Sequence, residues 1–174
     1  KKGKKYDVRK FFAEAINNGA RGIITNVKKI INNKIPIIYN KEIKNKLPSL
    51  LKYHYKKLPN QIIAVTGTNG KTSVSWYLYQ ILLLNKIKVS YLGTVGQYIN
   101  KKKISNLENT TPDICTLFSL ASKHYGKGID SLIFEASSHG IDQGRIKGFP
   151  ITIAAITNIT KDHIDYHKNF QSYK

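Results

Sequence analysis

The hydrophobic pattern of residues 58–174 alternates between short apolar runs and longer stretches of helical spacing. Four runs rich in β-branched and other apolar residues lie at 62–65, 89–94, 130–135 and 151–158. Runs of this length, bounded by turn residues, are typical of strands that are buried in a sheet. We therefore predict a mostly parallel sheet whose strands are separated by helices.

Two of the intervening stretches have the spacing of helices. The first begins at Lys71 and is apolar nearly all round, which predicts a helix buried on more than one side. Its apolar residues include Val74, Trp76, Tyr77, Leu78, Tyr79, Ile81, Leu82 and Leu84. The second follows Thr111-Pro112-Asp113, a pattern that predicts Thr111 as the N-cap and Pro112 as the first helical residue. The polar, lysine-rich stretch 97–109 predicts a hairpin or a loop.

Residues 1–57 predict a smaller unit of mixed helices and strands. A first helix is indicated by apolar residues at helical spacing, which are Val8, Phe11, Phe12, Ala15 and Ile16. Asn18-Gly19 is expected to end this helix. Short strands are predicted at 22–26 and 35–39. A second helix is predicted to begin at Glu42 or Pro48 and to end at about residue 57. The fold class is thus α/β, with a partial N-terminal domain at 1–57 and a partial phosphate-loop domain at 58–174.

Composition narrows the choice of function. The 174 residues carry a formal charge of +19, which favours a nucleic acid or a membrane surface as partner. However, only three of the basic residues are arginines, Arg9, Arg21 and Arg145, and nucleic-acid readers favour arginine for its bidentate fork. The scattered lysines are better explained by an AT-rich genome, so we predict no specific nucleic-acid partner.

Targeting signals and cysteine content indicate the compartment. No apolar run approaches the roughly 20 residues that span a bilayer, and no apolar segment follows the basic start as a signal peptide requires. The single Cys115 excludes an internal disulfide and suits the reducing cytoplasm. The sequence contains no Met, and we interpret it as part of a longer protein.

The strongest chemical signal is the sequence T-G-T-N-G-K-T at 66–72, which follows an apolar strand and opens a helix. Glycines in such a turn let backbone N–H groups point at an anion, and the helix N-terminus adds partial positive charge. Lys71 would reach the outer phosphates of a nucleotide and the Thr72 hydroxyl would bind Mg²⁺. The generic phosphate-loop pattern requires glycine at position 65, where this chain has Val65.

Two further strands end in residues that can bind a metal ion. Glu135 closes the apolar run 130–135, and His163 follows the run 151–158 within a segment rich in His and Asp. Ligands of open α/β sheets bind at the carboxyl ends of the strands. A phosphate loop beside a carboxylate and an imidazole predicts a nucleotide–Mg²⁺ site. A loop merely capped by Asp and His is an equally good interpretation of His167.

Four motifs together resemble the Mur ligases. These are T-G-T-N-G-K-T at 66–72, N-T-T-P-D at 109–113, E-A-S-S-H-G-I-D-Q-G-R at 135–145 and T-N-I-T-K-D-H-I-D-Y-H at 157–167. The valine at position 65 is also usual in that family. The resemblance implies an ATP- and Mg²⁺-dependent ligase of peptidoglycan precursor synthesis, cytoplasmic and monomeric at full length. Its substrates would be UDP-MurNAc-L-Ala-D-Glu, activated as an acyl phosphate, and a diamino acid.

The resemblance also implies roles for individual residues. ATP would be bound by Gly67, Thr68, Asn69, Gly70, Lys71 and Thr72. The metal ligands would be Thr72, Glu135 and His163, and the catalytic residues Lys71, Glu135 and His163. The UDP-sugar-peptide would be contacted by Asn109, Thr110, Thr111, Ser137, Gln143 and Arg145. The family's carbamylated lysine would fall beyond Lys174, so we expect the 174 residues alone to be inactive.

Three other interpretations remain open from the sequence. The first is another Mur-type ligase, similar to folylpolyglutamate synthase or cyanophycin synthetase. The second is a basic, nucleic-acid-binding phosphate-loop NTPase, which the positive net charge favours. The third is an inert gene fragment. The choice between diaminopimelate and lysine as the added residue cannot be made from these motifs.

Overall fold

A computed structural model describes residues 11–28 and 35–174 of the chain. The chain divides into two compact units, Lys1–Leu50 and Leu51–Lys174. The division falls inside helix α2 (Ile43–His54), earlier than the domain boundary predicted between residues 57 and 58. Val8, which was expected in the first helix, lies outside the described residues.

The first unit contains short elements. Helix α1 (Phe12–Asn17) ends at Asn18-Gly19 as predicted, and Gly19 has a positive φ of 92°. Strands β1 (Ile23–Thr25) and β2 (Ile37–Tyr39) pair in parallel. Helix α2 begins at the earlier of the two predicted positions and contains Pro48.

The second unit is built on a six-stranded sheet in the order β6-β5-β4-β7-β3-β8. Its strands are β3 (Gln61–Thr66), β4 (Val89–Gly93), β5 (Gly96–Ile99), β6 (Lys102–Ser105), β7 (Ser131–Glu135) and β8 (Ile153–Ile156). Strands β4, β7, β3 and β8 are parallel, whereas β5 and β6 form an antiparallel hairpin at one edge. The predicted mostly parallel sheet and the predicted hairpin are both confirmed.

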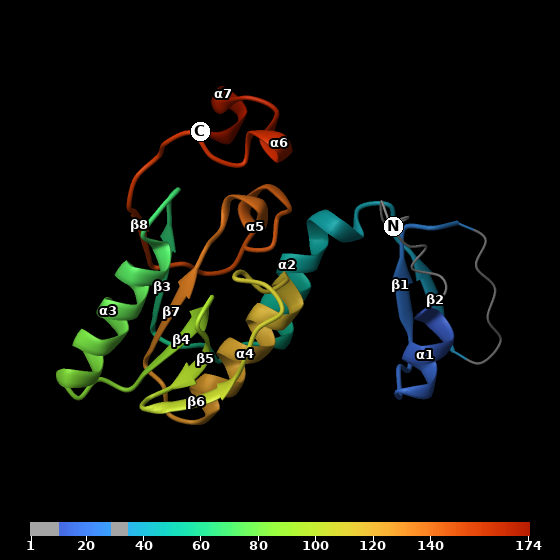
Figure 1. Ribbon diagram of the computed structural model, residues 1–174. Helices are drawn as coiled ribbons and strands as arrows, with labels where there is room; N and C mark the ends of the chain where they lie inside the picture. Colours follow the sequence, from blue (N-terminus) through green and yellow to red (C-terminus); the bar gives the residue numbers. More distant parts are fainter. Residues whose placement is uncertain (1–10, 29–34) are drawn as a thin grey trace. The chain divides into compact units, whose positions relative to one another are not determined.

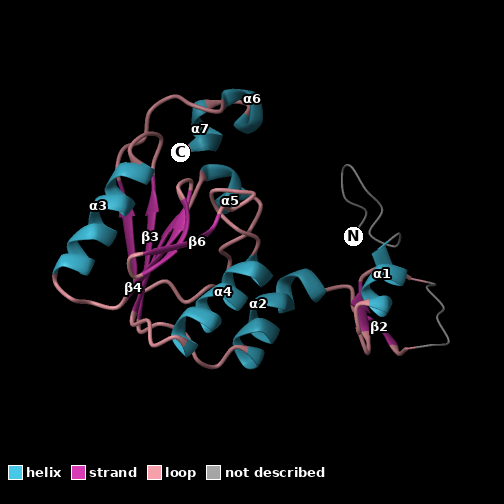
Figure 2. Cartoon of the chain, turned by 60° about the horizontal axis from the view of Figure 1, so that its bottom comes forward, coloured by secondary structure: helices cyan, strands magenta, loops and turns pink. Residues whose placement is uncertain are grey.

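Helices cover both faces of this sheet (Figures 1 and 2). Helix α3 (Lys71–Leu84) packs on one face, and helix α4 (Ile114–Gly126) packs on the other. Three short helices, α5 (Ser138–Asp142), α6 (Ile164–His167) and α7 (Phe170–Tyr173), lie at the end of the sheet where the parallel strands finish (Figure 1). The phosphate loop is at this same end, because it joins β3 to α3.

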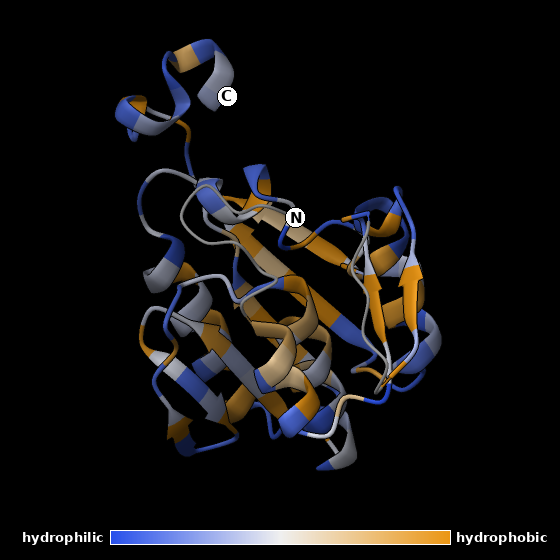
Figure 3. Ribbon diagram, turned by 90° about the vertical axis from the view of Figure 1, so that its right-hand side faces the viewer, coloured by the Kyte–Doolittle hydropathy of each residue, from blue (hydrophilic) through white to orange (hydrophobic). Residues whose placement is uncertain are grey.

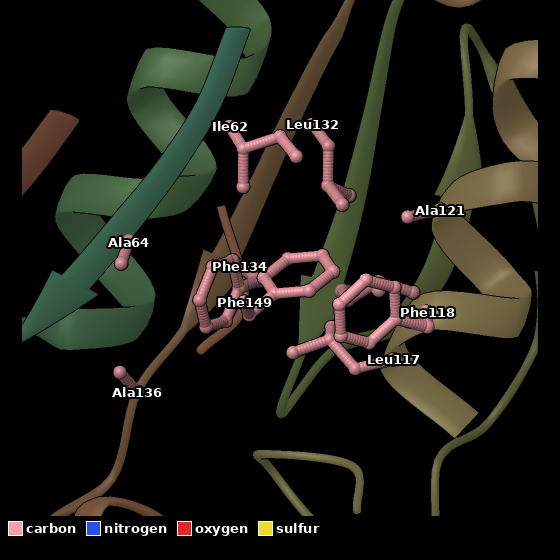
Figure 4. Packing of buried hydrophobic residues seen from close by; sticks show 10 residues of the cluster. Ile62, Ala64, Leu117, Phe118, Ala121, Leu132, Phe134, Ala136 and Phe149 are labelled. Carbon is pink, nitrogen blue, oxygen red and sulfur yellow. The ribbon is translucent and has the colours of Figure 1, made fainter. Parts of the chain in front are cut away.

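Strand alternation divides the core into two layers, because successive side chains of a strand point to opposite faces. On β3, Ile62 and Ala64 pack in the layer that includes α4, whereas Ile63 and Val65 pack with Tyr79 of α3. The α4 layer is rich in phenylalanine. The ring of Phe149 lies 5.0 Å from that of Phe118 and 5.8 Å from that of Phe134, with both pairs edge-on (Figure 4).

Helices α6 and α7 contribute no buried residues and are mostly hydrophilic or intermediate in hydropathy (Figure 3). They are held over the sheet end by polar contacts. The Gln143 side-chain amide donates to the Tyr166 hydroxyl at 3.3 Å, and the Tyr166 hydroxyl donates to Asp142 at 2.8 Å. None of the described helices is both long and apolar enough to cross a bilayer.

The prediction that α3 is buried on more than one side is wrong for the described part of the chain. Val74, Tyr77, Ile81 and Leu84 are exposed, and Leu84 retains 82% of its accessible surface. The helix packs on the sheet through one face only, where Ser75 and Tyr79 are buried. Apolar residues all round a helix show that it can be buried, but they do not specify which neighbours cover it.

The predicted N-cap of α4 is also wrong. Asp113, not Thr111, caps the helix, and its carboxylate accepts hydrogen bonds from the backbone N–H groups of Cys115 and Thr116. Thr111 is fully buried and donates instead to the backbone carbonyl of Glu135 at 2.9 Å. A contact with a distant strand therefore competes successfully for the hydroxyl that local sequence assigns to the cap.

A buried histidine joins α4 to strands β4 and β5 of the sheet. His124 is 1% exposed. Its Nδ1 lies 2.9 Å from the Ser90 hydroxyl and its Nε2 lies 2.7 Å from the Gln97 amide nitrogen. Burial, and secondarily the charge of Lys127, lowers the pKa of His124 from 6.5 to about 4. The folded chain therefore keeps this imidazole neutral at pH values where an unfolded chain binds a proton.

The buried, neutral His124 predicts that the free energy of unfolding decreases at acid pH. As the pH falls from 6.5 to about 4, the unfolded state gains a proton that the folded state does not. The free energy of unfolding should therefore fall by about 1.4 kcal/mol per pH unit and level off below that range. Urea melts of wild type and His124→Gln across this range measure the difference. Replacing the exposed His54 by Gln should leave the wild-type pH profile intact, and an equal profile for His124→Gln would contradict the assignment.

Candidate nucleotide and carboxylate site

The phosphate loop has the backbone geometry that its glycines predict. Gly67 and Gly70 have φ angles of 137° and 80°, in the region that favours glycine. A Cβ atom on Gly67 would lie 2.1 Å from Oγ1 of Thr157. The Nζ of Lys71 donates to the carbonyls of Gly67 at 2.7 Å and Thr68 at 2.9 Å. Lys71 thus closes over the loop, and among the described residues the partners of its ammonium group are two neutral carbonyl oxygens.

The end of β8 fixes the outer part of this loop. Asn158 accepts from the backbone N–H of Asn69 at 3.1 Å through Oδ1 and donates to the Asn69 carbonyl at 2.9 Å through Nδ2. The Thr157 hydroxyl donates to that same carbonyl at 2.6 Å. From the sequence, Thr157 and Asn158 were predicted only as the polar end of the apolar run 151–158, with no role in the site. Their contacts couple the position of the loop to strand β8.

Glu135 is the most enclosed carboxylate of the described chain, with 0% of its surface exposed. Oε2 accepts from the Thr72 hydroxyl at 2.8 Å and from the Thr94 hydroxyl at 3.1 Å. Oε1 accepts from the Thr94 backbone N–H at 3.0 Å and from the Tyr91 hydroxyl. All four donors are neutral, so the carboxylate is hydrogen-bonded without a basic partner among them.

These contacts follow from the register of the strands. Tyr91 of β4 lies opposite Ile133 of β7, so Gly93 lies beside Glu135 on the same face of the sheet. A Cβ atom on Gly93 would lie 2.2 Å from Oε1 of Glu135 and 2.4 Å from the Tyr91 hydroxyl. Burial, and then the neighbouring Glu135, raises the pKa of Tyr91, which keeps its hydroxyl a donor.

Two of the three predicted metal ligands fit Mg²⁺. Thr72 and Glu135 provide hard oxygen atoms 2.8 Å apart, and Mg²⁺ prefers a few such ligands together with phosphate oxygens and water. His163 lines the same cavity, but its side chain is 47% exposed and lies 3.5 Å from Asp162. No group of three or more His, Cys, Asp or Glu side chains capable of holding a metal occurs among the residues described. A metal bound here would therefore depend on the nucleotide for its remaining ligands.

Four of the six predicted substrate residues, Thr111, Ser137, Gln143 and Arg145, form one hydrogen-bonded group. The Thr111 hydroxyl accepts from the backbone N–H of Ser137 at 2.8 Å, and the Thr111 carbonyl accepts from Nη1 of Arg145 at 2.8 Å. Oε1 of Gln143 accepts from Nε and Nη2 of Arg145 at 3.0 and 2.7 Å. Arg145 is thus held in place by neutral oxygens, which leaves its charge available to an anion.

Every residue predicted for the site except Gly67 lines one cavity of about 550 Å³. Thr110 reaches it from the segment before α4, and its hydroxyl lies 3.2 Å from that of Thr94. The cavity is lined by Thr68, Asn69, Gly70, Lys71, Thr72, Ser73, Thr94, Asn109, Thr110, Thr111, Glu135, Ser137, Ser138, His139, Gln143, Arg145, His163 and Tyr173. Motifs far apart in the sequence therefore share one site.

Several residues of the cavity were not identified from the sequence. Thr94 was predicted only as the end of a strand, and Tyr173 was given no role. The Tyr173 hydroxyl lies 2.8 Å from Oγ1 of Thr68 in the phosphate loop. The ring of His139 lies 4.7 Å from that of His163, and burial followed by the nearby His163 and His167 lowers its pKa. The S-S-H-G motif was a signal for His139, although it did not indicate these neighbours.

A parallel sheet, a glycine loop leading into a helix N-terminus and a buried carboxylate at the adjacent strand end define a phosphate-loop α/β domain. Comparison with known proteins gives the family. The Mur ligase middle domain matches residues 65–174. The chain belongs to the Mur ligase family.

Individual relatives agree with this placement. The chain is 39% identical to UDP-N-acetylmuramoyl-L-alanyl-D-glutamate–2,6-diaminopimelate ligase of Rickettsia bellii over 168 residues, which are 94% of this chain and 35% of that enzyme. A solved structure of an enzyme of that name has a TM-score of 0.76 and 30% identity, covering 95% of this chain and 33% of its own. The MurF ligase from Thermotoga maritima, in complex with ADP, has a TM-score of 0.62 at 24% identity, covers 99% of this chain and 36% of its own, and shares the fold.

The chain spans only about a third of the length of the curated relatives it matches, 35% in the case of the Rickettsia bellii enzyme. The matched third contains all four motifs described above. The site described above therefore lies within the matched third.

The close packing of α5 against Thr111 gives a test of the site's construction. A Cβ atom on Gly140 would lie 2.8 Å from Cβ of Thr111, and β-branched Thr111 has little freedom to move. Gly140→Ala should therefore lower the free energy of unfolding by about 1–3 kcal/mol, measured by urea denaturation. Gly126→Ala is the matched control, because a Cβ there has no heavy atom within 4 Å. Equal stability of the two variants would contradict the packing described.

Proposed function

We propose that the protein is an ATP-dependent ligase that joins 2,6-diaminopimelate to the free side-chain carboxyl of D-glutamate in UDP-MurNAc-L-Ala-D-Glu. The observation that carries the proposal is the shared cavity, where the phosphate loop, a buried carboxylate and the Thr111–Arg145 group meet. The names of the relatives support the choice of both substrates. Such a reaction uses ATP and a UDP-linked precursor, which fits a cytoplasmic, monomeric enzyme of cell-wall synthesis.

The chemistry explains why a nucleotide and a carboxylate substrate share one cavity. A carboxylate is a poor electrophile, because its charge repels a nucleophile and oxide is a poor leaving group. Attack of the carboxylate oxygen on the γ-phosphorus of ATP releases ADP and forms an acyl phosphate. The amine then attacks the carbonyl carbon, loses a proton, and expels phosphate to leave the amide. The protein's contribution is to position the reactants and stabilise the charge.

The phosphate loop would bind the nucleotide. The N–H groups of Thr68 and Asn69 are already bonded to Asn158, so the phosphates would meet the N–H groups at the N-terminus of α3, and Lys71 would exchange its two carbonyl partners for phosphate oxygens. Thr72, Glu135 and His163 would hold Mg²⁺, with Glu135 and Thr72 already in contact. When bound, the metal ion neutralises phosphate charge and favours transfer of the γ-phosphate.

The substrate residues would hold the second reactant. Asn109, Thr110, Thr111, Ser137 and Gln143 present neutral hydrogen-bonding groups, and Arg145 presents a charge suited to a carboxylate or a phosphate. Thr111 donates to the backbone carbonyl of Glu135. This contact ties the substrate group to the strand end that would hold the metal, so the two reactants would be placed by one strand.

Removal of the loop lysine tests nucleotide binding. Lys71→Ala should weaken binding of ATP–Mg²⁺ by roughly 10- to 100-fold, because a charged hydrogen-bond donor to phosphate is lost. Isothermal titration calorimetry on the purified chain measures this change. Lys88→Ala removes the same charge from an exposed residue before β4, at the opposite end of the sheet, and should bind like wild type. Equal affinity of wild type and Lys71→Ala would exclude the assigned phosphate loop.

Removal of the arginine tests the substrate side. Arg145→Ala should weaken binding of UDP-MurNAc-L-Ala-D-Glu by roughly 10- to 100-fold and leave ATP affinity unchanged. Lys147→Ala, an exposed charge two positions along the chain, is the matched control. If the arginine variant binds the UDP-linked dipeptide as well as the control does, Arg145 has no role in holding that substrate.

A further inference from the structure

The two oxygens of Glu135 have different surroundings. Oε2 faces the phosphate loop and accepts from two hydroxyls, those of Thr72 at 2.8 Å and Thr94 at 3.1 Å. Oε1 faces strand β4 and accepts from the Thr94 backbone N–H at 3.0 Å and from the Tyr91 hydroxyl. A hydroxyl can rotate away when a cation arrives, whereas a backbone N–H in a loop beside a strand cannot. The carboxylate is therefore asymmetric, with one fixed oxygen and one that can change partners.

Tyr91 holds its hydroxyl in a rigid setting. Its side chain is fully buried, and its ring meets the Trp76 ring edge-on at 5.3 Å. The rings of Tyr79 and Tyr98 lie 5.9 and 6.2 Å away. Tyr91 is also pinned at its backbone, because it pairs with Ile133 of β7 in the centre of the sheet. The phenol oxygen therefore has almost no freedom to follow a moving carboxylate.

Gly93 supplies the space in which this contact forms. A Cβ at this position would meet both Oε1 of Glu135 and the Tyr91 hydroxyl at less than 2.5 Å. Glycine at position 93 and tyrosine at position 91 thus act together, since the first admits the carboxylate and the second anchors it. Neither residue is needed to form the strand, which other apolar residues would form equally well.

We infer that Tyr91 is a positioning residue for the magnesium carboxylate, holding Oε1 of Glu135 so that Oε2 is presented to the Thr72 side of the cavity. The inference rests on the proposed function, in which Glu135 and Thr72 hold the metal ion. Tyr91 itself is not among the residues that line the cavity. It lies behind the carboxylate, in the layer between the sheet and α3.

The chemistry of the donor supports this role. A carboxylate that binds a metal is usually oriented by further hydrogen bonds, and loss of such a partner typically weakens metal affinity by about 10- to 100-fold. A neutral phenol can orient the carboxylate without neutralising it, whereas lysine or arginine in its place would compete with the cation. Tyrosine in the aromatic layer therefore combines a rigid position with an uncharged donor.

The test compares two tyrosines of the same aromatic cluster. Tyr91→Phe removes only the hydroxyl that reaches Glu135. Tyr79→Phe is the matched control, because the Tyr79 hydroxyl is buried and has no hydrogen-bond partner among the described residues. Mn²⁺ is the probe, and its affinity in the presence of ADP is measured by electron paramagnetic resonance on the purified chain. ADP affinity without metal is measured in parallel, and melting curves establish that each variant is folded.

Tyr91→Phe should weaken Mn²⁺ binding about tenfold, with ADP binding in the absence of metal unchanged. Tyr79→Phe should match wild type in both measurements. Equal Mn²⁺ affinity in Tyr91→Phe and wild type would overturn the inference, because a purely structural tyrosine would change stability alone. Tyr91→Leu, which also removes the donor, is measured in the same way if the phenylalanine variant does not fold.

Glu135→Gln separates failure of the inference from failure of the proposed function. If it loses Mn²⁺ affinity while Tyr91→Phe does not, the metal assignment stands and the role of Tyr91 is wrong. If Glu135→Gln binds Mn²⁺ like wild type, the metal site of the proposed function is wrong, and the inference about Tyr91 falls with it.

Discussion

The burial of the Glu135 carboxylate is the constraint on which the rest of the site depends. A carboxylate removed from water is costly unless its oxygens are hydrogen-bonded, and here four neutral donors provide those bonds. They come from the first turn of α3, from β4 and from the residue after β4. The arrangement therefore fixes the phosphate loop, two neighbouring strands and the loop after β4 with respect to one another. The Glu135 backbone carbonyl adds Thr111 to the same assembly.

Much of this fold could be predicted because its information is local. The four parallel strands are apolar runs between turn residues, and the strand-to-helix loop needs glycine at 67 and 70, where φ is positive. Helix α1 ends at Asn18-Gly19, the position that these two residues predict. In each of these cases, neighbours in the sequence are also the neighbours that decide the conformation.

The predictions that failed depended on distant residues. Thr111 looks like an N-cap because Asp and Pro follow it, but its hydroxyl is used by a strand end 24 positions away. Tyr91 reads as an apolar strand residue until the register places it beside Glu135, which is 44 positions away. The outer face of α3 also could not be predicted from its own residues. The apolar side chains of Val74, Tyr77, Ile81 and Leu84 predict burial, but they are exposed, because burial also requires a neighbouring element that covers them.

The charges in the cavity are arranged differently from those of a structural ion-pair network. Lys71 donates to two backbone carbonyls, and Arg145 donates to a carbonyl and a side-chain amide oxygen. In the described part of the chain, Glu135 accepts from three hydroxyls and one backbone N–H. Two cations and one carboxylate thus line the same cavity, with each satisfied by neutral groups. If these charges were paired with one another, they would serve only to stabilise the fold. Because they are kept apart, two positive centres remain for anions and one negative centre remains for a cation, which is the arrangement that the proposed function requires.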